Sequence, residues 1–506
     1  MKDETIQEVS QLFQKVLTVV PSENPKELYA DHVKIRQVLE KISAEQDKFV
    51  PNKDRASKLP AFLEWAKNNN IKFDNSEIKE SDKGFSLIAK EDIPEKGNAV
   101  EVPRSAILTS DSSKINKGLR ELFLNDQLVQ SVENCSLVLL LAHEYLDPKS
   151  HWTPYLDILP GELLSPLTMT NEQLLSLKPS NAFILAMQFF RCIARHYVYF
   201  FLMTHARESA RLLPKLSSDA IKKTLFTSKN FSFDLYVWCT AIVTSRVNRI
   251  PNLVQIGNQT TTSPSLIPIM DFANFEFIGD AAAAQSEVFY SIPHKKVQLL
   301  LHRNVKAGTE ILIPIGNKSN RDCFLYSGFV PLEDSPVDIY ELRLGFPQKT
   351  EQWKLTAAQR MGVLNSKEMA ATFVIHLSTF YSHQLEFSAF WNFAKLFVAK
   401  TANDFNTEAN IKQAREYLLK RFTLYLEGYK TLPKSEPKDA SSLEKYIWRL
   451  KRSEQKNLEA MVAYFEKSVE EIIKSNGTTF PEIQENSTSA QETPTAPTAT
   501  PTTSDT

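Results

Sequence analysis

Apolar positions recur along this chain of 506 residues with two different periods, and the change of period divides it into regions. In residues 1–70 the spacing is helical, with apolar side chains at Val33, Ile35, Val38, Leu39 and Ile42. A second short helix around Trp65 is predicted to end at the asparagines of residues 68–70. We therefore expect an N-terminal helical region over residues 1–70.

Strand character begins after residue 71. Residues 86–89 and 99–102 predict two short strands, and the turn between them contains Pro94 and Gly97. Farther along, residues 288–292 and 297–301 flank a polar turn and predict a β-hairpin, which a strand over residues 310–315 follows.

A helical stretch separates these two groups of strands. Residues 136–145 predict one helix, and residues 182–205 predict a long helix that is apolar on most faces and therefore buried. The pattern predicts a single β-rich domain over residues 71–335 that carries a helical insertion at about 115–250.

Residues 338–474 are expected to form an all-α C-terminal domain. Ser441 and Glu444 have the spacing of a capping box before a long final helix. Its apolar stripe comprises Leu443, Ile447, Leu450, Leu458, Met461, Phe465, Val469 and Ile472. In residues 475–506 Thr, Pro, Ser and Ala dominate, so we expect a disordered tail. The predicted fold class is α+β.

Composition and charge narrow the function. A net charge of −1 and the lack of any Lys/Arg-rich block argue against a nucleic-acid partner, which would need a basic face. No apolar run reaches the about 18 residues of a membrane helix, and the polar N-terminus is unlike a signal peptide. The cytoplasm is the expected compartment, and nothing in the sequence opposes the nucleus.

Metal binding is not expected either. The cysteines at 135, 192, 239 and 323 form no C-x-x-C pair, and the histidines form no H-x-x-x-H pair. Buried thiols in a reducing compartment are the simpler interpretation.

Four short motifs follow one another in the second half of the β-rich domain. They are Arg246-Val247-Asn248, the run from Asp271 to Phe275, the run from Ile315 to Asn320, and Ser327-Gly328-Phe329. Earlier in the chain, Arg55 lies ten residues before Trp65, and Lys83-Gly84-Phe85 follows. Any one of these pieces is a weak signal, but their order and spacing together are specific.

In that order the motifs resemble those of SET-domain protein methyltransferases of the Rubisco-methyltransferase-like branch, and within it the enzymes that methylate a histidine of actin. The resemblance covers residues 50–335 motif by motif. It implies a knotted active-site segment, S-adenosyl-L-methionine as the cofactor, and a protein substrate, actin, as the partner. Methyl transfer from a sulfonium leaves the protein mainly the task of positioning donor and acceptor.

The resemblance also implies which residues do this. Asn248 would face the target side chain, and Ile315 stands where the family has a tyrosine at the acceptor site. The residues implied to bind the cofactor are Arg55, Lys83, Gly84, Phe85, Arg246, Asp271, Phe272, Ala273, Asn274, Phe275, Ser327, Gly328 and Phe329.

Three positions depart from the family pattern. Phe275 replaces a histidine, Ile315 replaces the tyrosine, and Met270 replaces a tryptophan. Lysine, with a pKa of about 10.4, needs help to lose its proton, whereas histidine, with a pKa of about 6.5, is mostly neutral at pH 7. We therefore expect the loss of the tyrosine hydroxyl to harm lysine methylation more than histidine methylation.

Several of these residues also have a purely structural interpretation. Arg246 and Asp271 are also compatible with a structural ion pair, Asn274 with a turn residue, and Gly84 and Gly328 with positions of positive φ. At the level of function, the alternatives are a protein-lysine methyltransferase and a catalytically inactive SET-like module that binds a partner.

Overall fold

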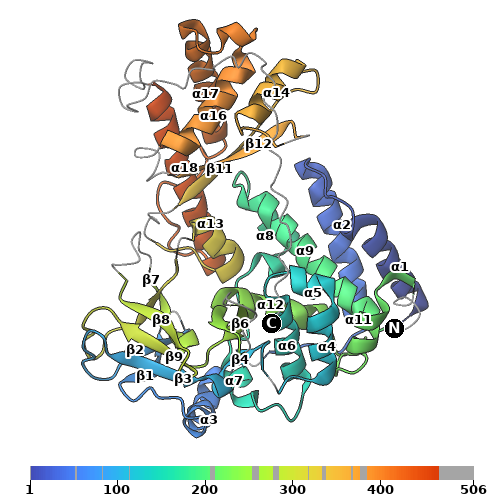
Figure 1. Cartoon of the computed structure of the whole chain (residues 1–506), viewed down its shortest axis with the longest axis vertical. Helices are drawn as coiled ribbons and strands as arrows, with labels where there is room; N and C mark the ends of the chain where they lie inside the picture. The colour runs from blue at the N-terminus through green and yellow to red at the C-terminus, as the bar shows by residue number, and fades with distance from the viewer. Residues whose placement is uncertain are drawn as a thin grey trace, which may run out of the picture.

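The computed structural model of this chain describes residues 2–51, 54–81, 84–112, 114–205, 211–253, 261–276, 284–316, 318–332, 338–365, 368–376 and 384–466. The predicted tail over 475–506 lies outside these residues, as do Lys83, Val469 and Ile472. The strands gather at one side of the molecule, most helices of the insertion and the first N-terminal helices lie on the other side, and the C-terminal helices rise above both (Figure 1).

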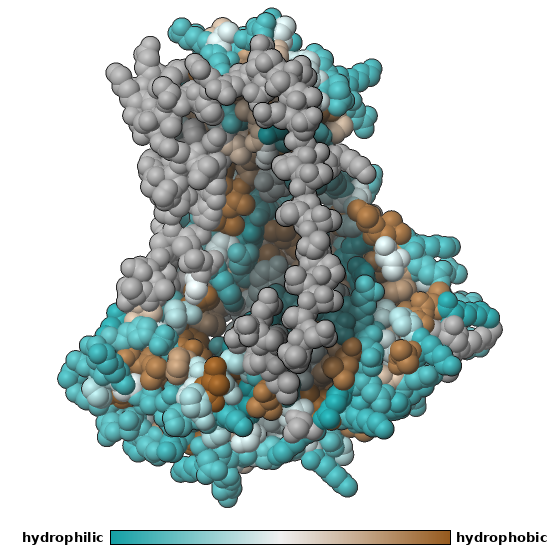
Figure 2. Space-filling model, in the orientation of Figure 1, coloured by the Kyte–Doolittle hydropathy of each residue, from teal (hydrophilic) through white to brown (hydrophobic). Residues whose placement is uncertain are grey.

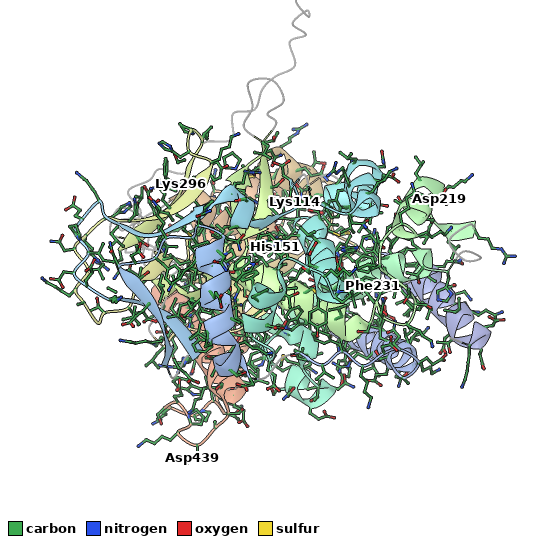
Figure 3. All side chains as sticks on the ribbon, turned by 90° about the horizontal axis from the view of Figure 1, so that it is seen from below. Lys114, His151, Asp219, Phe231, Lys296 and Asp439 are labelled. Carbon is green, nitrogen blue, oxygen red and sulfur yellow. The ribbon has the colours of Figure 1, made fainter. Side chains whose placement is uncertain are left out.

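The predicted N-terminal helices are present. They are α1 (Asp3–Leu12), the π-helical turn η1 (Phe13–Leu17), α2 (Pro25–Ser43) and α3 (Arg55–Asn68). Asn24 caps α2, whose buried face packs on the insertion. Asn70 follows α3 with φ of +57°, so the expected asparagine stop is confirmed. In the view from below, α3 runs beside the segment of His151 (Figure 3), whose carbonyl accepts a hydrogen bond from Trp65 Nε1.

The β-rich region consists of short sheets rather than one large sheet. Its strands are β1 (Ser76–Ser81), β2 (Gly84–Ala89), β3 (Asn98–Pro103), β4 (Leu108–Thr109), β5 (Asn248–Pro251), β6 (Thr262–Leu266), β7 (Asn274–Glu276), β8 (Ser286–Ser291), β9 (Lys296–Leu301) and β10 (Leu312–Pro314). They pair as β1-β2, β3-β9-β8 and β4-β6-β5, all antiparallel, and as the parallel pair β7-β10.

The predicted hairpin is confirmed as β8 and β9, which pair from Ser286↔Leu301 to Ser291↔Lys296. Lys295 takes a positive φ in its turn. The strand expected at 310–315 is the shorter β10, which pairs in parallel with β7. That pairing brings the Asp271–Phe275 and Ile315–Asn320 motifs together.

The helical insertion contains α4 (Lys117–Asn125), α5 (Gln127–Ser131), α6 (Cys135–Leu146), α7 (Thr153–Ile158), α8 (Asn171–Leu175), α9 (Ala182–Met203), α11 (Lys215–Ile221) and α12 (Phe233–Arg246). As expected, α9 is buried on most faces. It packs on α2, α11 and α12. The end of α12 delivers Arg246 to the strands.

The prediction of an all-α C-terminal domain is wrong in one respect, because the domain contains two strands. β11 (Ile339–Gly345) and β12 (Ala370–His376) pair antiparallel along their whole length. Tyr340, Leu342 and Leu344 are buried and alternate with more exposed residues, which is strand periodicity that the helical interpretation of this region overlooked. The remaining elements are α14 (Gln352–Arg360), α16 (Gln384–Val398), α17 (Glu408–Glu427) and α18 (Ser442–Glu466).

The capping box at the start of α18 is confirmed. Glu444 N donates to Ser441 Oγ (3.3 Å), while the Glu444 carboxylate accepts from Ser441 N (2.8 Å). The predicted domain limits stay a prediction, although one large apolar cluster ends at Ile311 and another begins at Tyr340. A third cluster joins α18 to the insertion and to residues 324–330.

Candidate active site

A cavity of about 1130 Å³ opens where the strands, the insertion and the C-terminal helices meet. Its wall comes from the end of α12, from β5, β7, β8 and β10, from residues 327–332 and from α18. On the face seen in Figure 2, hydrophobic side chains gather along the inner walls of the hollow between the C-terminal helices and the lower body. Segments far apart in sequence therefore share one cavity.

Most of the predicted site residues reach this cavity. Those that line it are Arg246, Asn248, Asp271, Ala273, Asn274, Phe275, Ile315, Ser327 and Phe329. Arg55, Gly84, Phe85, Phe272 and Gly328 support it from behind without lining it. Phe272, for example, packs its ring against Phe62 and Phe85.

Two half-buried arginines, Arg246 and Arg55, lie close enough for their charges to interact. Arg246, the last residue of α12, donates from Nη1 to Ser245 Oγ (2.8 Å). Arg55, the first residue of α3, donates from Nε to the carbonyl of Ile158 (2.7 Å), and its guanidinium lies 4.8 Å from the Phe85 ring centroid. Burial and then the charge of Arg246 lower the pKa of Arg55 to about 10. This concentration of positive charge favours an anionic ligand group.

Asp271 does not form the simple ion pair that was considered for Arg246. Its carboxylate accepts a hydrogen bond from Tyr155 Oη, from α7 of the insertion. Burial raises the pKa of Asp271 to about 6, which the Tyr155 hydrogen bond and the charge of Arg246 oppose. In the described part of the chain, Arg246 thus keeps guanidinium hydrogens that Asp271 does not take.

Asn274 is fixed in the first position of β7. Its Nδ2 donates to Ser86 Oγ (3.0 Å) on β2 and to the Glu310 carboxylate. These bonds orient the amide from two neighbouring segments, so the turn-residue interpretation does not describe it. Gly84, with φ of +92°, does occupy a backbone conformation that favours glycine.

Asn248, Ile315 and Met270 all line the cavity. Asn248 begins β5, and its Nδ2 donates to the Arg246 carbonyl (3.1 Å). Ile315 follows β10 and is 7% exposed, and Met270 is 1% exposed. This part of the wall offers a ligand one amide that can orient it and two apolar side chains. Position 315 carries no hydroxyl.

The Ser327-Gly328-Phe329 motif closes the opposite side. Phe329 stacks on Phe275 with ring centroids 6.0 Å apart and planes 7° apart. Gly328 has φ of +75°, and a Cβ there would collide with the carbonyl oxygen of Leu164. The flat pair of rings suits a planar ligand group at the rim of the cavity.

Several functional candidates were missed by sequence reasoning. Tyr155 was not among the predicted site residues, and its hydrogen bond to Asp271 spans 116 residues. Tyr446 and Arg449 line the cavity from α18, where a helical apolar stripe gives no sign of it. Glu276 and Glu287 add carboxylates to the wall from within β7 and β8.

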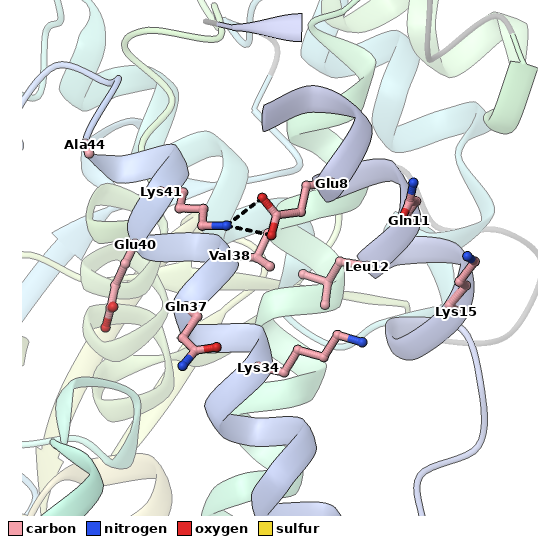
Figure 4. Close-up of a pocket in the computed structure, with 10 residues that line it drawn as sticks. All are labelled: Glu8, Gln11, Leu12, Lys15, Lys34, Gln37, Val38, Glu40, Lys41 and Ala44. Atoms are coloured by element: carbon pink, nitrogen blue, oxygen red, sulfur yellow. Dashed lines mark hydrogen bonds and ion pairs between the residues drawn. The ribbon is translucent and has the colours of Figure 1, made fainter. Parts of the chain in front are cut away.

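A second cavity, about 780 Å³, lies between α1 and α2 (Figure 4). Its side chains are mostly long and polar, and the Lys41–Glu8 ion pair spans it at 2.7 Å. It contains none of the predicted site residues. Among the described residues no group of three or more His, Cys, Asp or Glu side chains is arranged to hold a metal ion. Within the same residues, no helix is long and apolar enough to cross a membrane.

Comparison with known proteins gives relatives in sequence. No family model matches the chain. It is 27% identical over 375 residues to the actin-histidine N-methyltransferase of Xenopus tropicalis, covering 73% of this chain and 59% of that protein. It is 28% identical over 340 residues to the actin-histidine N-methyltransferase of Danio rerio, covering 67% and 53%. The chain thus matches less than two thirds of the length of these relatives.

Solved structures give the fold. The SET domain of LSMT bound to lysine and AdoHcy superposes with a TM-score of 0.60 at 17% identity, over 82% of this chain and 93% of that one. Rubisco LSMT bound to AdoMet superposes with a TM-score of 0.57, over 83% and 93%. This chain therefore has the SET fold of Rubisco LSMT with a helical insertion, as its motifs predicted.

Proposed function

We propose that this SET-fold chain is an S-adenosyl-L-methionine-dependent protein-histidine N-methyltransferase, and that its substrate is a histidine of actin. The observation that carries the proposal is one cavity that joins the half-buried Arg246, the Asn248 amide, Asn274 and the Phe275–Phe329 pair. Actin comes from the names of the sequence relatives alone.

The residues present fit the cofactor. The carboxylate of the cofactor suits the half-buried Arg246 and Arg55, since a guanidinium offers up to about five N–H donors and the hydrogen bonds named above use few of them. Asn274 would hold the amino-acid end of the cofactor, and Phe329 with Phe275 would stack on its adenine ring. When bound, the cofactor supplies an electrophilic methyl group.

The acceptor side suits an imidazole better than an ammonium group. A neutral imidazole has a lone pair ready, and an amide beside it orients the ring through the other nitrogen. Asn248 provides that amide, while Ile315 and Met270 form an apolar wall that disfavours a charged lysine. No side chain has to remove a proton before transfer.

The two alternative functions, a lysine methyltransferase and an inactive module, are judged by the same departures from the family pattern. A lysine methyltransferase would lack the hydroxyl at Ile315 that positions an amine. An inactive module is favoured by Phe275 and Ile315 and opposed by the intact Arg246, Asn248 and Asn274.

The test is transfer of a labelled methyl group to unmethylated actin, followed by peptide mass spectrometry. We expect one modified histidine, and loss of at least about 90% of the rate in Asn248→Ala. Arg249→Ala is the matched control, because successive side chains of β5 point to opposite faces and Arg249 pairs with Glu133 at the surface. Methylation of lysine, or donor binding without transfer, would contradict the proposal.

A further inference from the structure

We infer that helix α18 supports the wall of the active site. It holds residues 320–330 at both ends and thereby sets the affinity for the methyl donor. This inference rests on the proposed function. Arg449 and Ser453, one helical turn apart on α18, are its positioning residues.

The supported segment bends sharply before it reaches the cavity. It comprises α13 (Asn320–Asp322), the π-helical turn η6 (Cys323–Ser327), Gly328 in the left-handed conformation, and then Phe329 and Val330. Ser327, Phe329 and Val330 line the cavity. Within the described residues this segment pairs with no strand, so its position depends on the helices against which it packs, α9, α12 and α18.

The first attachment is at the end of the segment. Arg449 Nη1 donates to the carbonyl of Val330 (2.9 Å), while its Nε and Nη2 donate to the two oxygens of Glu436 (2.5 and 3.0 Å). The guanidinium also lies 5.6 Å from the ring centroid of Tyr446. A planar group held on two other sides gives its remaining bond a fixed direction, which fixes the backbone directly after Phe329.

The second attachment is at the start of the segment. The Asp338 carboxylate accepts from Asn320 N (3.0 Å), from Asn320 Nδ2 (3.2 Å) and from Ser453 Oγ. Asp338 is 5% exposed, and burial raises its pKa. Since a buried carboxylate needs its donors, this cluster ties the first residue of α13 to α18.

Apolar contacts fill the space between the two attachments. Phe324, Leu325 and Val330 belong to one buried cluster with Ile447 and Leu450 of α18. All these α18 residues lie on one face of the helix, at spacings of three and four. The C-terminal domain therefore supports the donor side of the cavity as well as facing its open side.

A variant of Ser453 can distinguish support of the cavity wall from direct contact with the ligand. Arg449 lines the cavity, but Ser453 does not, so any effect of Ser453 on the donor passes through Asp338 and Asn320. The experiment measures the Kd of S-adenosylhomocysteine by calorimetry for the full chain and its Arg449→Met and Ser453→Ala variants. Hydrogen exchange of the amides of residues 320–330 is measured beside it.

We expect the Kd to rise about tenfold in Arg449→Met and about threefold in Ser453→Ala, with faster exchange confined to residues 320–330. Arg449→Lys, which still reaches the Val330 carbonyl, should recover part of the affinity. Arg452→Met is the matched control, because Arg452 pairs with Glu459 on the exposed side of α18; its Kd should equal that of the unmodified chain.

The outcomes distinguish this inference from the proposed function. Failure of the unmodified chain to bind S-adenosylhomocysteine would overturn both. The unmodified chain could instead bind S-adenosylhomocysteine while Ser453→Ala and Arg449→Lys keep the same affinity and the same hydrogen exchange. That result would overturn the inferred role of α18 alone. If Arg449→Met does not fold, Ser453→Ala and Arg449→Lys still test the inferred role of α18.

Discussion

Phe275 and Phe329 stack nearly parallel, with ring centroids 6.0 Å apart, although they come from β7 and from the turn after η6. Phe275 stands where the sequence pattern would place a histidine. The stack turns that departure into a contact with the residue expected beside the adenine ring. It offers a physical reason why a phenylalanine is tolerated at this position.

Phe275→Ala should therefore weaken donor binding. An aromatic pair contributes about 0.5–1.5 kcal/mol beyond its buried area, so the Kd for S-adenosylhomocysteine should rise about two- to tenfold. Phe275→Tyr keeps the ring and is the control. An unchanged Kd in Phe275→Ala would show that the stack has no part in holding the donor side.

Gly328 and Gly308 form a matched pair for a steric test. Their φ values are +75° and +78°, but a Cβ on Gly328 would strike the Leu164 backbone whereas one on Gly308 would meet nothing within 4 Å. Gly308→Ala should lower the free energy of unfolding by about 1–2 kcal/mol through backbone strain alone. Gly328→Ala should cost about 3 kcal/mol or more and abolish donor binding. Urea unfolding of both variants measures the difference, and equal losses would refute the close approach.

Ile315→Tyr tests the choice of acceptor. Restoring a hydroxyl at this position should help position an amine, so transfer to a lysine-containing peptide should rise relative to transfer to the matched histidine peptide, by about tenfold. The two rates are compared by mass spectrometry of methylated peptides. A many-fold gain toward histidine instead would show that Ile315 impairs the proposed reaction.

His32 should make the fold sensitive to acid. Burial and then the charge of Arg36 lower its pKa to about 4, and both ring nitrogens lack a hydrogen-bond partner within the described structure. Because this folded-state pKa lies below the unfolded value of about 6.5, the unfolded chain binds the proton more readily. Its contribution to stability is therefore present above about pH 6.5 and is lost as the pH falls toward about 4.

His32→Phe removes this titration and keeps a ring against Phe190, whose centroid lies 4.6 Å away. Between about pH 6.5 and pH 5, the unmodified chain should lose about 2 kcal/mol more than the variant. Urea unfolding at both pH values measures it, with His294→Phe, in an exposed turn, as the control. Parallel losses in all three proteins would show that His32 is protonated in the folded state.

Local signals predicted local structure well. The capping box of Ser441 and Glu444 and the hairpin of β8 and β9 depend on neighbours within a few residues, and both are present. The resemblance supplied the order of the cavity segments. The β11–β12 pair was missed because the helical spacing of its surroundings was extended across an alternating segment.

Contacts across long separations could not be found in this way. Tyr155 reaches Asp271 across 116 residues, and Arg449 reaches Val330 across 119. Neither bond has a periodicity or a turn signal, since each depends on how whole elements pack. The roles assigned to the individual site residues remain proposals that the variants above test.

The position of α18 late in the chain also affects when the cavity can be completed during synthesis. Residues 244–332 supply most of the cavity wall, but Tyr446 and Arg449 complete it. A chain that leaves the ribosome N-terminus first can fold its strands and insertion well before α18 emerges. Until α18 has emerged, the nascent chain therefore lacks the part of the cavity wall that Tyr446 and Arg449 provide.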